Sequence, residues 1–123
     1  MLKTMSKFTY IHQDILPERD FVRTVETGDI LLFYTNHFGA KVQRMLTNSD
    51  FDHVAMIIRG KNGDPMVFES NQMHGVAIYN WNQYISYFDL YGKVALRRLN
   101  FMRKAEIQPK LIQFARHNIG QKY

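Results

Sequence analysis

The stretch FDHVAMIIRGKNGDPMVFES, residues 51–70, contains two mainly apolar runs separated by GKNGD. Apolar, β-branched runs of this length predict strands, and the Gly and Asn cluster between them predicts a reversal of the chain. We therefore expect residues 53–59 and 65–70 to pair as an antiparallel hairpin. This hairpin decides the fold and the candidate chemistry, because His53 opens its first strand and Glu69 lies near the end of its second.

The width of the turn determines whether His53 and Glu69 can meet. Successive side chains of a strand point to opposite faces of the sheet, so the register fixes which side chains share a face. A turn centred on residue 61 sets the two directly opposite each other, and one centred on residue 62 makes them diagonal neighbours on one face. A two-residue turn at Asn62 and Gly63 instead places them on opposite faces. A shared site therefore requires the wider loop.

The rest of the chain predicts an α+β fold, a small antiparallel sheet with flanking helices. A short helix started by Pro17 belongs to an expected N-terminal appendage of residues 1–26. Three further strands are predicted at residues 29–34, 75–79 and 93–98, and two short helices within residues 37–50 and 81–88. The first of these helices ends at Asn48 and Ser49, and the second carries Trp81, Tyr84, Ile85 and Phe88 at helical spacing. A last helix over residues 107–118 should pack through Ile107, Leu111 and Phe114, with Gly120 at its C-terminal stop.

Length and charge restrict the function. The 123 residues, 46% hydrophobic and 22% charged, suit one domain with a core of its own. A net charge of +5 favours anionic partners, but the densest basic groups, LRRL at 96–99 and MRK at 102–104, are short and interrupted by apolar residues. We therefore expect no specific nucleic-acid binding. No apolar run is long enough for a transmembrane segment or a signal peptide, which predicts a cytoplasmic protein.

Most catalytic motifs are absent from the sequence. It has no cysteine, and its five histidines, at 12, 37, 53, 74 and 117, form no helical metal-binding pair. Neither a Gly-rich phosphate loop nor a Gly-x-Ser-x-Gly elbow is present, so we expect no metal and no cofactor. The pair His53 and Glu69 remains. A packed strand histidine and a strand-end carboxylate that faces water would explain the same residues, and the hairpin pattern leaves both interpretations open.

The order of the short motifs distinguishes these interpretations. GDILLF (28–33), FDHVAMII (51–58), MVFES (66–70) and GVAI (75–78) are followed by GQKY (120–123). This series resembles the circularly permuted branch of the NlpC-type papain-like superfamily, especially YiiX/YebB-like hydrolases and, more distantly, lecithin retinol acyltransferase. The resemblance covers about residues 27–123 and implies one permuted papain-like domain.

The resemblance implies that His53 is the general base and that Glu69 holds its ring in the productive tautomer. Asp29 would be structural, and Ala55 stands where relatives often have Gly. In such proteins the nucleophilic Cys follows the Gly-x-x-Tyr motif, so we expect the chain to be truncated before its nucleophile. The complete protein would be a cysteine hydrolase or acyltransferase that acts on an amide, ester or thioester of a small molecule, peptide or lipid-like compound.

Two other functions stay open. One is a catalytically inactive papain-like domain that binds a ligand or partner in the cleft, and the other is an unrelated basic module that recognises anionic surfaces. If a Cys-bearing helix is missing, Ala55 and Ile57, which flank His53 on its face, should border an exposed apolar patch or be covered by a second chain. Self-association through that face is a corresponding expectation.

Overall fold

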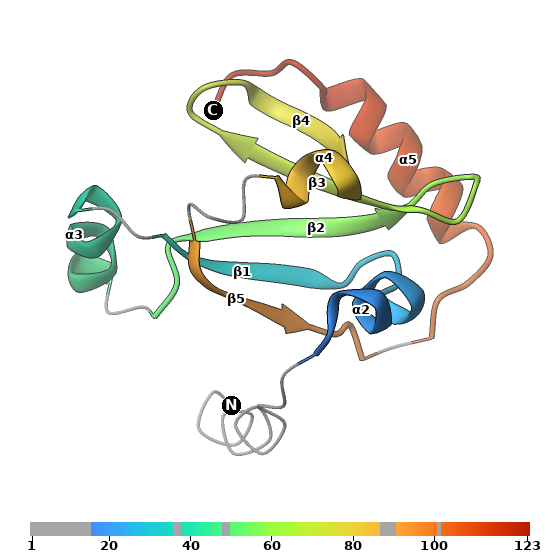
Figure 1. The fold of residues 1–123 in the computed structure, drawn as a ribbon. Helices are drawn as coiled ribbons and strands as arrows, with labels where there is room; N and C mark the ends of the chain where they lie inside the picture. Colours follow the sequence, from blue (N-terminus) through green and yellow to red (C-terminus); the bar gives the residue numbers. More distant parts are fainter. Residues whose placement is uncertain (1–15, 36–37, 48–49, 87–90, 101) are drawn as a thin grey trace.

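The computed structural model describes residues 16–35, 38–47, 50–86, 91–100 and 102–123. Figure 1 shows five antiparallel strands in the order β4-β3-β2-β1-β5, with helices on both faces of the sheet. The strands are β1 (Ile30–Thr35), β2 (His53–Arg59), β3 (Pro65–Asn71), β4 (Gly75–Asn80) and β5 (Tyr91–Arg97). The helices are α2 (Glu18–Thr24), α3 (Phe38–Thr47), α4 (Trp81–Ile85) and α5 (Ile107–Asn118).

This architecture confirms the α+β prediction. β2 has the predicted bounds, and each of the other predicted strands begins or ends within two residues of its expected position. The alternation of apolar residues and the Gly-rich turns are local signals, which is why they locate the strands well. Asn48, Ser49 and Phe88, which entered the helix predictions, lie outside the described residues, as do residues 1–15 of the expected appendage.

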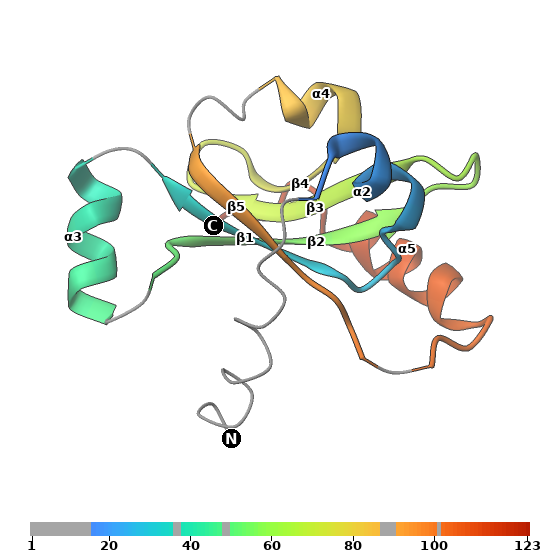
Figure 2. The same cartoon turned by 60° about the horizontal axis from the view of Figure 1, so that its bottom comes forward.

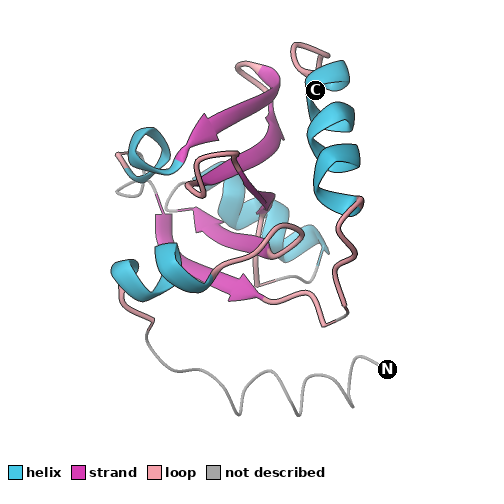
Figure 3. Cartoon of the chain, turned by 90° about the vertical axis from the view of Figure 1, so that its right-hand side faces the viewer, coloured by secondary structure: helices cyan, strands magenta, loops and turns pink. Residues whose placement is uncertain are grey.

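The core lies on the face of the sheet that carries His53. Leu31, Phe33, Ala55, Ile57 and Val67 form the sheet side of this core, and Phe21, Val25, Trp81 and Tyr84 cover them from α2, its C-cap and α4. Figure 3 shows α5, the helix beside the C-terminus, on the opposite side of the sheet from α2 and α4. In Figure 2, α3 stands beyond the end of β1 and the start of β2. No helix of the described part of the chain has the length and apolar character needed to cross a membrane.

The prediction that Ala55 and Ile57 border an exposed apolar patch or lie under a second chain is wrong. Ala55 and Ile57 are 3% and 0% exposed, because α2 and α4 cover this face within the same chain. α2 belongs to the residues expected to form an appendage, yet Phe21 and Val25 are core residues, 6% and 0% exposed. Exposed apolar side chains occur elsewhere, for example Val54 on the opposite face of β2, which is 53% exposed.

Helix α5 packs more tightly through a small residue than through the predicted aromatic one. Ala115 is fully buried, whereas Phe114 is 57% exposed and meets the ring of Phe68 edge-on at a centroid distance of 6.3 Å. The predicted face therefore contacts the sheet, but Phe114 lies at its margin and not at its centre.

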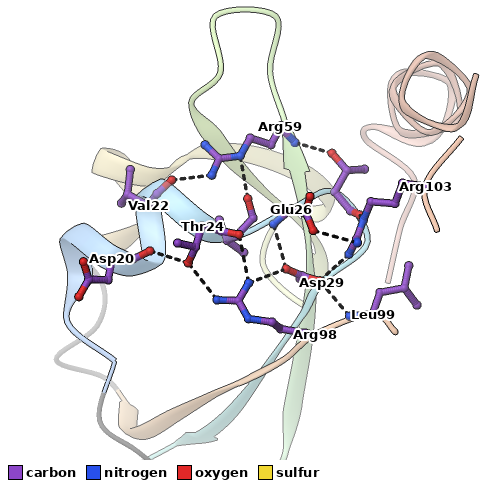
Figure 4. Close-up of polar contacts among 11 residues, drawn as sticks. Asp20, Val22, Thr24, Glu26, Asp29, Arg59, Arg98, Leu99 and Arg103 are labelled. Carbon is purple, nitrogen blue, oxygen red and sulfur yellow. Dashed lines mark hydrogen bonds and ion pairs between the residues drawn. The ribbon is translucent and has the colours of Figure 1, made fainter. Parts of the chain in front are cut away.

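A buried carboxylate fixes the start of β1. Asp29 is 1% exposed and accepts hydrogen bonds from the backbone N–H groups of Glu26 and Leu99, each at 2.9 Å. Its carboxylate also forms ion pairs with Arg103 at 2.7 Å and Arg98 at 3.5 Å (Figure 4). Asp29 thus joins the turn before β1 to the segment that follows β5, which is a structural role.

The C-terminal segment lies against the outer edge of β4. The N–H of Gly120 donates to the carbonyl of Val76 and the N–H of Val76 donates to the carbonyl of Gln121, each at 2.8 Å. Gly75 makes this approach possible, because it has φ +66° and a Cβ placed there would lie 2.0 Å from the Gln121 oxygen. Gly120, the glycine of the GQKY motif, is therefore part of a backbone contact with β4.

Replacement of the buried carboxylate should destabilise the protein. Asp29→Asn should lower the free energy of unfolding by about 3 kcal/mol, because two arginines would then face a neutral group in a largely buried place. Glu26→Gln is the control, since the Glu26 side chain is 62% exposed and pairs with the same Arg103 at 3.0 Å; it should cost less than about 1 kcal/mol. Urea denaturation measures both, and equal losses would contradict the assigned role of Asp29.

A matched pair of glycines tests the contact at β4. Gly75 and Gly63 both have positive φ, +66° and +87°, but a Cβ on Gly63 would meet nothing within 4 Å. Gly63→Ala should cost only the left-handed strain, about 1 kcal/mol, whereas Gly75→Ala should cost about 1–2 kcal/mol more by displacing residues 120–121. Hydrogen exchange at the Val76 and Gly120 amides should accelerate only in Gly75→Ala. Similar unfolding free energies for the two variants would show that the close approach contributes nothing.

Candidate active site

The register of the β2–β3 hairpin brings the predicted residues together. Ile57 pairs with Val67 and Arg59 with Pro65, so residue 62 is the centre of the hairpin and residues 60–64 form its loop. The N–H of Gly60 donates to the carbonyl of Asp64 at 2.9 Å and closes this loop. The turn is the wider one that a shared site requires, and His53 and Glu69 are diagonal neighbours on one face.

The side chains of this pair are in direct contact. His53 Nε2 lies 3.3 Å from Glu69 Oε1. The Glu69 side chain is only 5% exposed and that of His53 is 22% exposed, so the imidazole lies between the buried carboxylate and solvent. The ring of Phe33, which is opposite His53 in the β1–β2 pairing, has its centroid 5.4 Å from the imidazole centroid. The alternative that Glu69 faces water is therefore wrong.

Two residues that the sequence did not single out complete the surroundings of Glu69. The hydroxyl of Tyr84 donates to Oε1 at 2.5 Å, and Nδ2 of Asn71 donates to Oε2 at 2.8 Å. Asn71 lies two positions after Glu69 on the same strand face, so the alternation of β3 contained a signal for it. Tyr84 comes from α4, and its helical spacing indicated only a core position.

These contacts determine the protonation of the site. Burial raises the pKa of Glu69, but hydrogen bonds from His53, Tyr84 and Asn71, together with the charge of His53, outweigh burial and hold the pKa below its usual range. Burial, and then the hydrogen bond to Glu69, raise the pKa of Tyr84, so its hydroxyl stays protonated and can donate. At neutral pH Glu69 is thus a carboxylate that faces Nε2 of His53.

An ionised carboxylate at Nε2 fixes the orientation of the imidazole and favours the tautomer that carries its proton on Nε2. Nδ1 is then the ring nitrogen that can take a proton from a nucleophile. A carboxylate-oriented imidazole is the acid–base half of a nucleophilic site. The chain contains no cysteine, so these 123 residues hold no thiol for His53 to activate.

A groove of about 340 Å³ lies on the other face of the sheet, between β2, β3 and α5. Its apolar lining includes Val54, Met56, Phe68 and Phe114. Val54 and Met56 alternate with His53 and Ala55 along β2, so the sheet separates the groove from the imidazole. His53 does not line the groove, although Glu69 and Ala55 are among its lining residues.

The α+β fold is that of a permuted papain-like domain, as a family match and a solved relative show. Residues 24–123 match the permuted papain-like amidase family, YaeF/YiiX, C92, and the chain belongs to this family.

Two Escherichia coli relatives agree with this assignment. The curated protein YiiX of strain K12, described as uncharacterized, is 30% identical over 98 residues, which are 80% of this chain and 46% of YiiX. The crystal structure of "metalloprotein yiiX" from strain O157:H7 is 31% identical with a TM-score of 0.65 and covers 80% of this chain and 52% of its own. The chain therefore spans about half the length of these relatives.

Because that relative is described as a metalloprotein, we ask whether this chain could hold a metal. The described residues contain no group of three or more His, Cys, Asp or Glu side chains that could hold a metal ion. His53 and Glu69 are two donors whose facing atoms are 3.3 Å apart and already paired. Catalytic zinc takes three protein ligands, so the pair His53 and Glu69 does not fit such an ion.

The ionised state of Glu69 should appear in the pH dependence of stability. Because its pKa is lowered in the folded state, Glu69 contributes stability above its unfolded pKa of about 4.3, and this contribution is lost as the pH falls through the folded pKa. Wild type should therefore exceed Glu69→Gln in unfolding free energy at pH 7, and the difference should shrink at pH 3. Urea denaturation at both pH values measures it.

Glu106→Gln is the control for this pH experiment, since Glu106 is exposed. It should have an unfolding free energy close to that of wild type at both pH values. A difference between wild type and Glu69→Gln that does not change with pH would contradict the ionised carboxylate.

Proposed function

We propose that this chain is the acid–base part of a cysteine amidase, in which His53 activates a thiol and Glu69 orients His53. The observation that supports the proposal most directly is the contact of the buried Glu69 carboxylate with Nε2 of His53 at 3.3 Å. Membership in a permuted papain-like amidase family supports the reaction class. The assignment of the two catalytic roles is our inference from the geometry.

In the proposed reaction, Nδ1 of His53 takes the proton of a cysteine thiol, and the thiolate attacks the carbonyl carbon of the substrate. The imidazolium then gives the proton to the amine nitrogen as the amide C–N bond breaks. The amine departs, and the acyl group stays bound to the cysteine as a thioester. Water, activated by the neutral imidazole, hydrolyses this thioester and restores the thiol. Glu69 stabilises the imidazolium while His53 carries the additional proton.

The proposal assigns the thiol to a segment outside these 123 residues. The absence of cysteine from the chain and the half-length coverage of the YiiX relatives support this assignment. An amide is the proposed substrate bond, and an ester or thioester follows the same steps. If an acceptor other than water attacks the acyl-enzyme, the same residues serve an acyltransferase.

A second candidate function is a papain-like domain without catalysis that binds a ligand or partner at the His53 side. The observation in its favour is the absence of a cysteine nucleophile. The two candidates differ in whether the encoded protein contains a cysteine that reaches His53.

The test compares this 123-residue chain with a longer protein that extends through the first cysteine encoded after residue 123. The short chain should not hydrolyse a small amide or thioester, and the longer protein should. His53→Ala in the longer protein should lower kcat/KM by about 10²–10⁴-fold, and Cys→Ala should abolish turnover. His117→Ala is the control, because this residue lies exposed on α5 and should leave kcat/KM unchanged. Activity that survives His53→Ala would contradict the proposal, and the lack of any encoded cysteine would favour the binding domain.

A further inference from the structure

Both oxygens of the Glu69 carboxylate are held by side chains other than His53. Tyr84 donates to Oε1, the same oxygen that faces His53 Nε2, at 2.5 Å. Asn71 donates to the other oxygen, Oε2, at 2.8 Å. A carboxylate bound at both oxygens cannot rotate about its last torsion angle without losing a hydrogen bond, so its plane is fixed relative to the imidazole.

The structure holds Tyr84 itself in place. Tyr84 is 3% exposed, and its helix α4 is capped by Asn80, whose side chain accepts a hydrogen bond from the Gln83 N–H at 2.8 Å. At the start of α4, Trp81 stacks against Phe21 at 4.4 Å and donates from Nε1 to Glu18 at 3.1 Å. Contacts between α4 and α2 therefore determine where the Tyr84 hydroxyl points.

We propose that Tyr84 and Asn71 are positioning residues, which act on His53 through Glu69. Their significance for catalysis rests on the function proposed above, but their effect on the His53 ring does not. Hydrogen bonds to the charged form of a carboxyl favour that form, and burial disfavours it. Tyr84 and Asn71 thus keep the buried Glu69 ionised, and an ionised Glu69 keeps the proton of the neutral imidazole on Nε2.

The competing explanation is that Tyr84 only fills the core. Its ring lies 5.9 Å from that of Phe33 and 5.7 Å from that of Tyr79. Tyr79 provides a matched control, because it belongs to the same aromatic cluster but its hydroxyl contacts Nδ2 of Asn71, at 3.5 Å. Tyr→Phe removes one hydroxyl at either position, but Tyr79 is half-buried and its hydroxyl reaches Glu69 only through Asn71.

The experiment measures the Glu69 carboxyl by ¹³C NMR and the His53 ring nitrogens by ¹⁵N NMR in this chain across pH, with signals assigned by their loss in Glu69→Gln and His53→Ala. Tyr84→Phe should raise the pKa of Glu69 by about one to two units and reduce the preference for the Nε2 proton. Tyr79→Phe, which loses only the long 3.5 Å contact with Asn71, should change both far less than Tyr84→Phe does. Equal spectra for the two variants would overturn the positioning role and leave Tyr84 as a core residue.

Asn71→Ala tests the other oxygen without removing a core side chain, and it keeps the proposal falsifiable if Tyr84→Phe does not fold. It should also raise the pKa of Glu69, and an unchanged pKa would contradict the role of Asn71. These spectra do not depend on hydrolysis. If they shift while the longer protein is inactive, only the proposed amidase function fails; if they do not shift while it is active, only the positioning role fails.

Discussion

The register between β2 and β3 is the constraint on which the candidate site depends. The side-chain period of a strand is two, so a slip of one residue would send Glu69 to the opposite face and leave His53 without its carboxylate. Arg59, the last residue of β2, holds the loop by donating to the carbonyl of Gly63 at 2.5 Å. The same guanidinium donates to the carbonyls of Val25 at 2.7 Å and Val22 at 2.6 Å, at the end of α2. One cation thus connects the hairpin loop to the helix that covers the core.

Three of the basic residues behind the net charge of +5, Arg59, Arg98 and Arg103, make contacts within the fold. Arg98 and Arg103 come from the two basic clusters noted in the sequence, and both pair with the buried Asp29. Arg98 also donates to the carbonyl of Thr24 at 3.1 Å (Figure 4). These cations, like Arg59, satisfy carbonyls and a buried carboxylate within the fold. Each of these arginines joins segments that lie far apart in the sequence through charge-assisted hydrogen bonds.

The sequence predicted the features that depend on local pattern. Alternating apolar residues and the GKNGD turn located the hairpin, and the hairpin arithmetic limited the ways in which His53 and Glu69 could meet. The covering of that face by α2 was missed, because residues 16–26 carry no signal for which surface they pack on. Tyr84 was missed for a similar reason. Helical spacing marks an apolar face, but only the tertiary structure shows that a buried carboxylate lies beneath it and requires donors.

The candidate acid–base pair needs no contact from a thiol-bearing segment in order to form. β2 supplies His53, β3 supplies Glu69 and Asn71, α4 supplies Tyr84, and these elements pack on one another within the described residues. In the proposed mechanism, His53 is therefore oriented before any nucleophile reaches it, and the thiol has only to approach Nδ1 in the right direction. If the acid–base pair and the thiol come from separate segments, the order of these segments along the chain matters little. A permuted connectivity can keep the same chemistry as long as the hairpin register and the donors to Glu69 are kept.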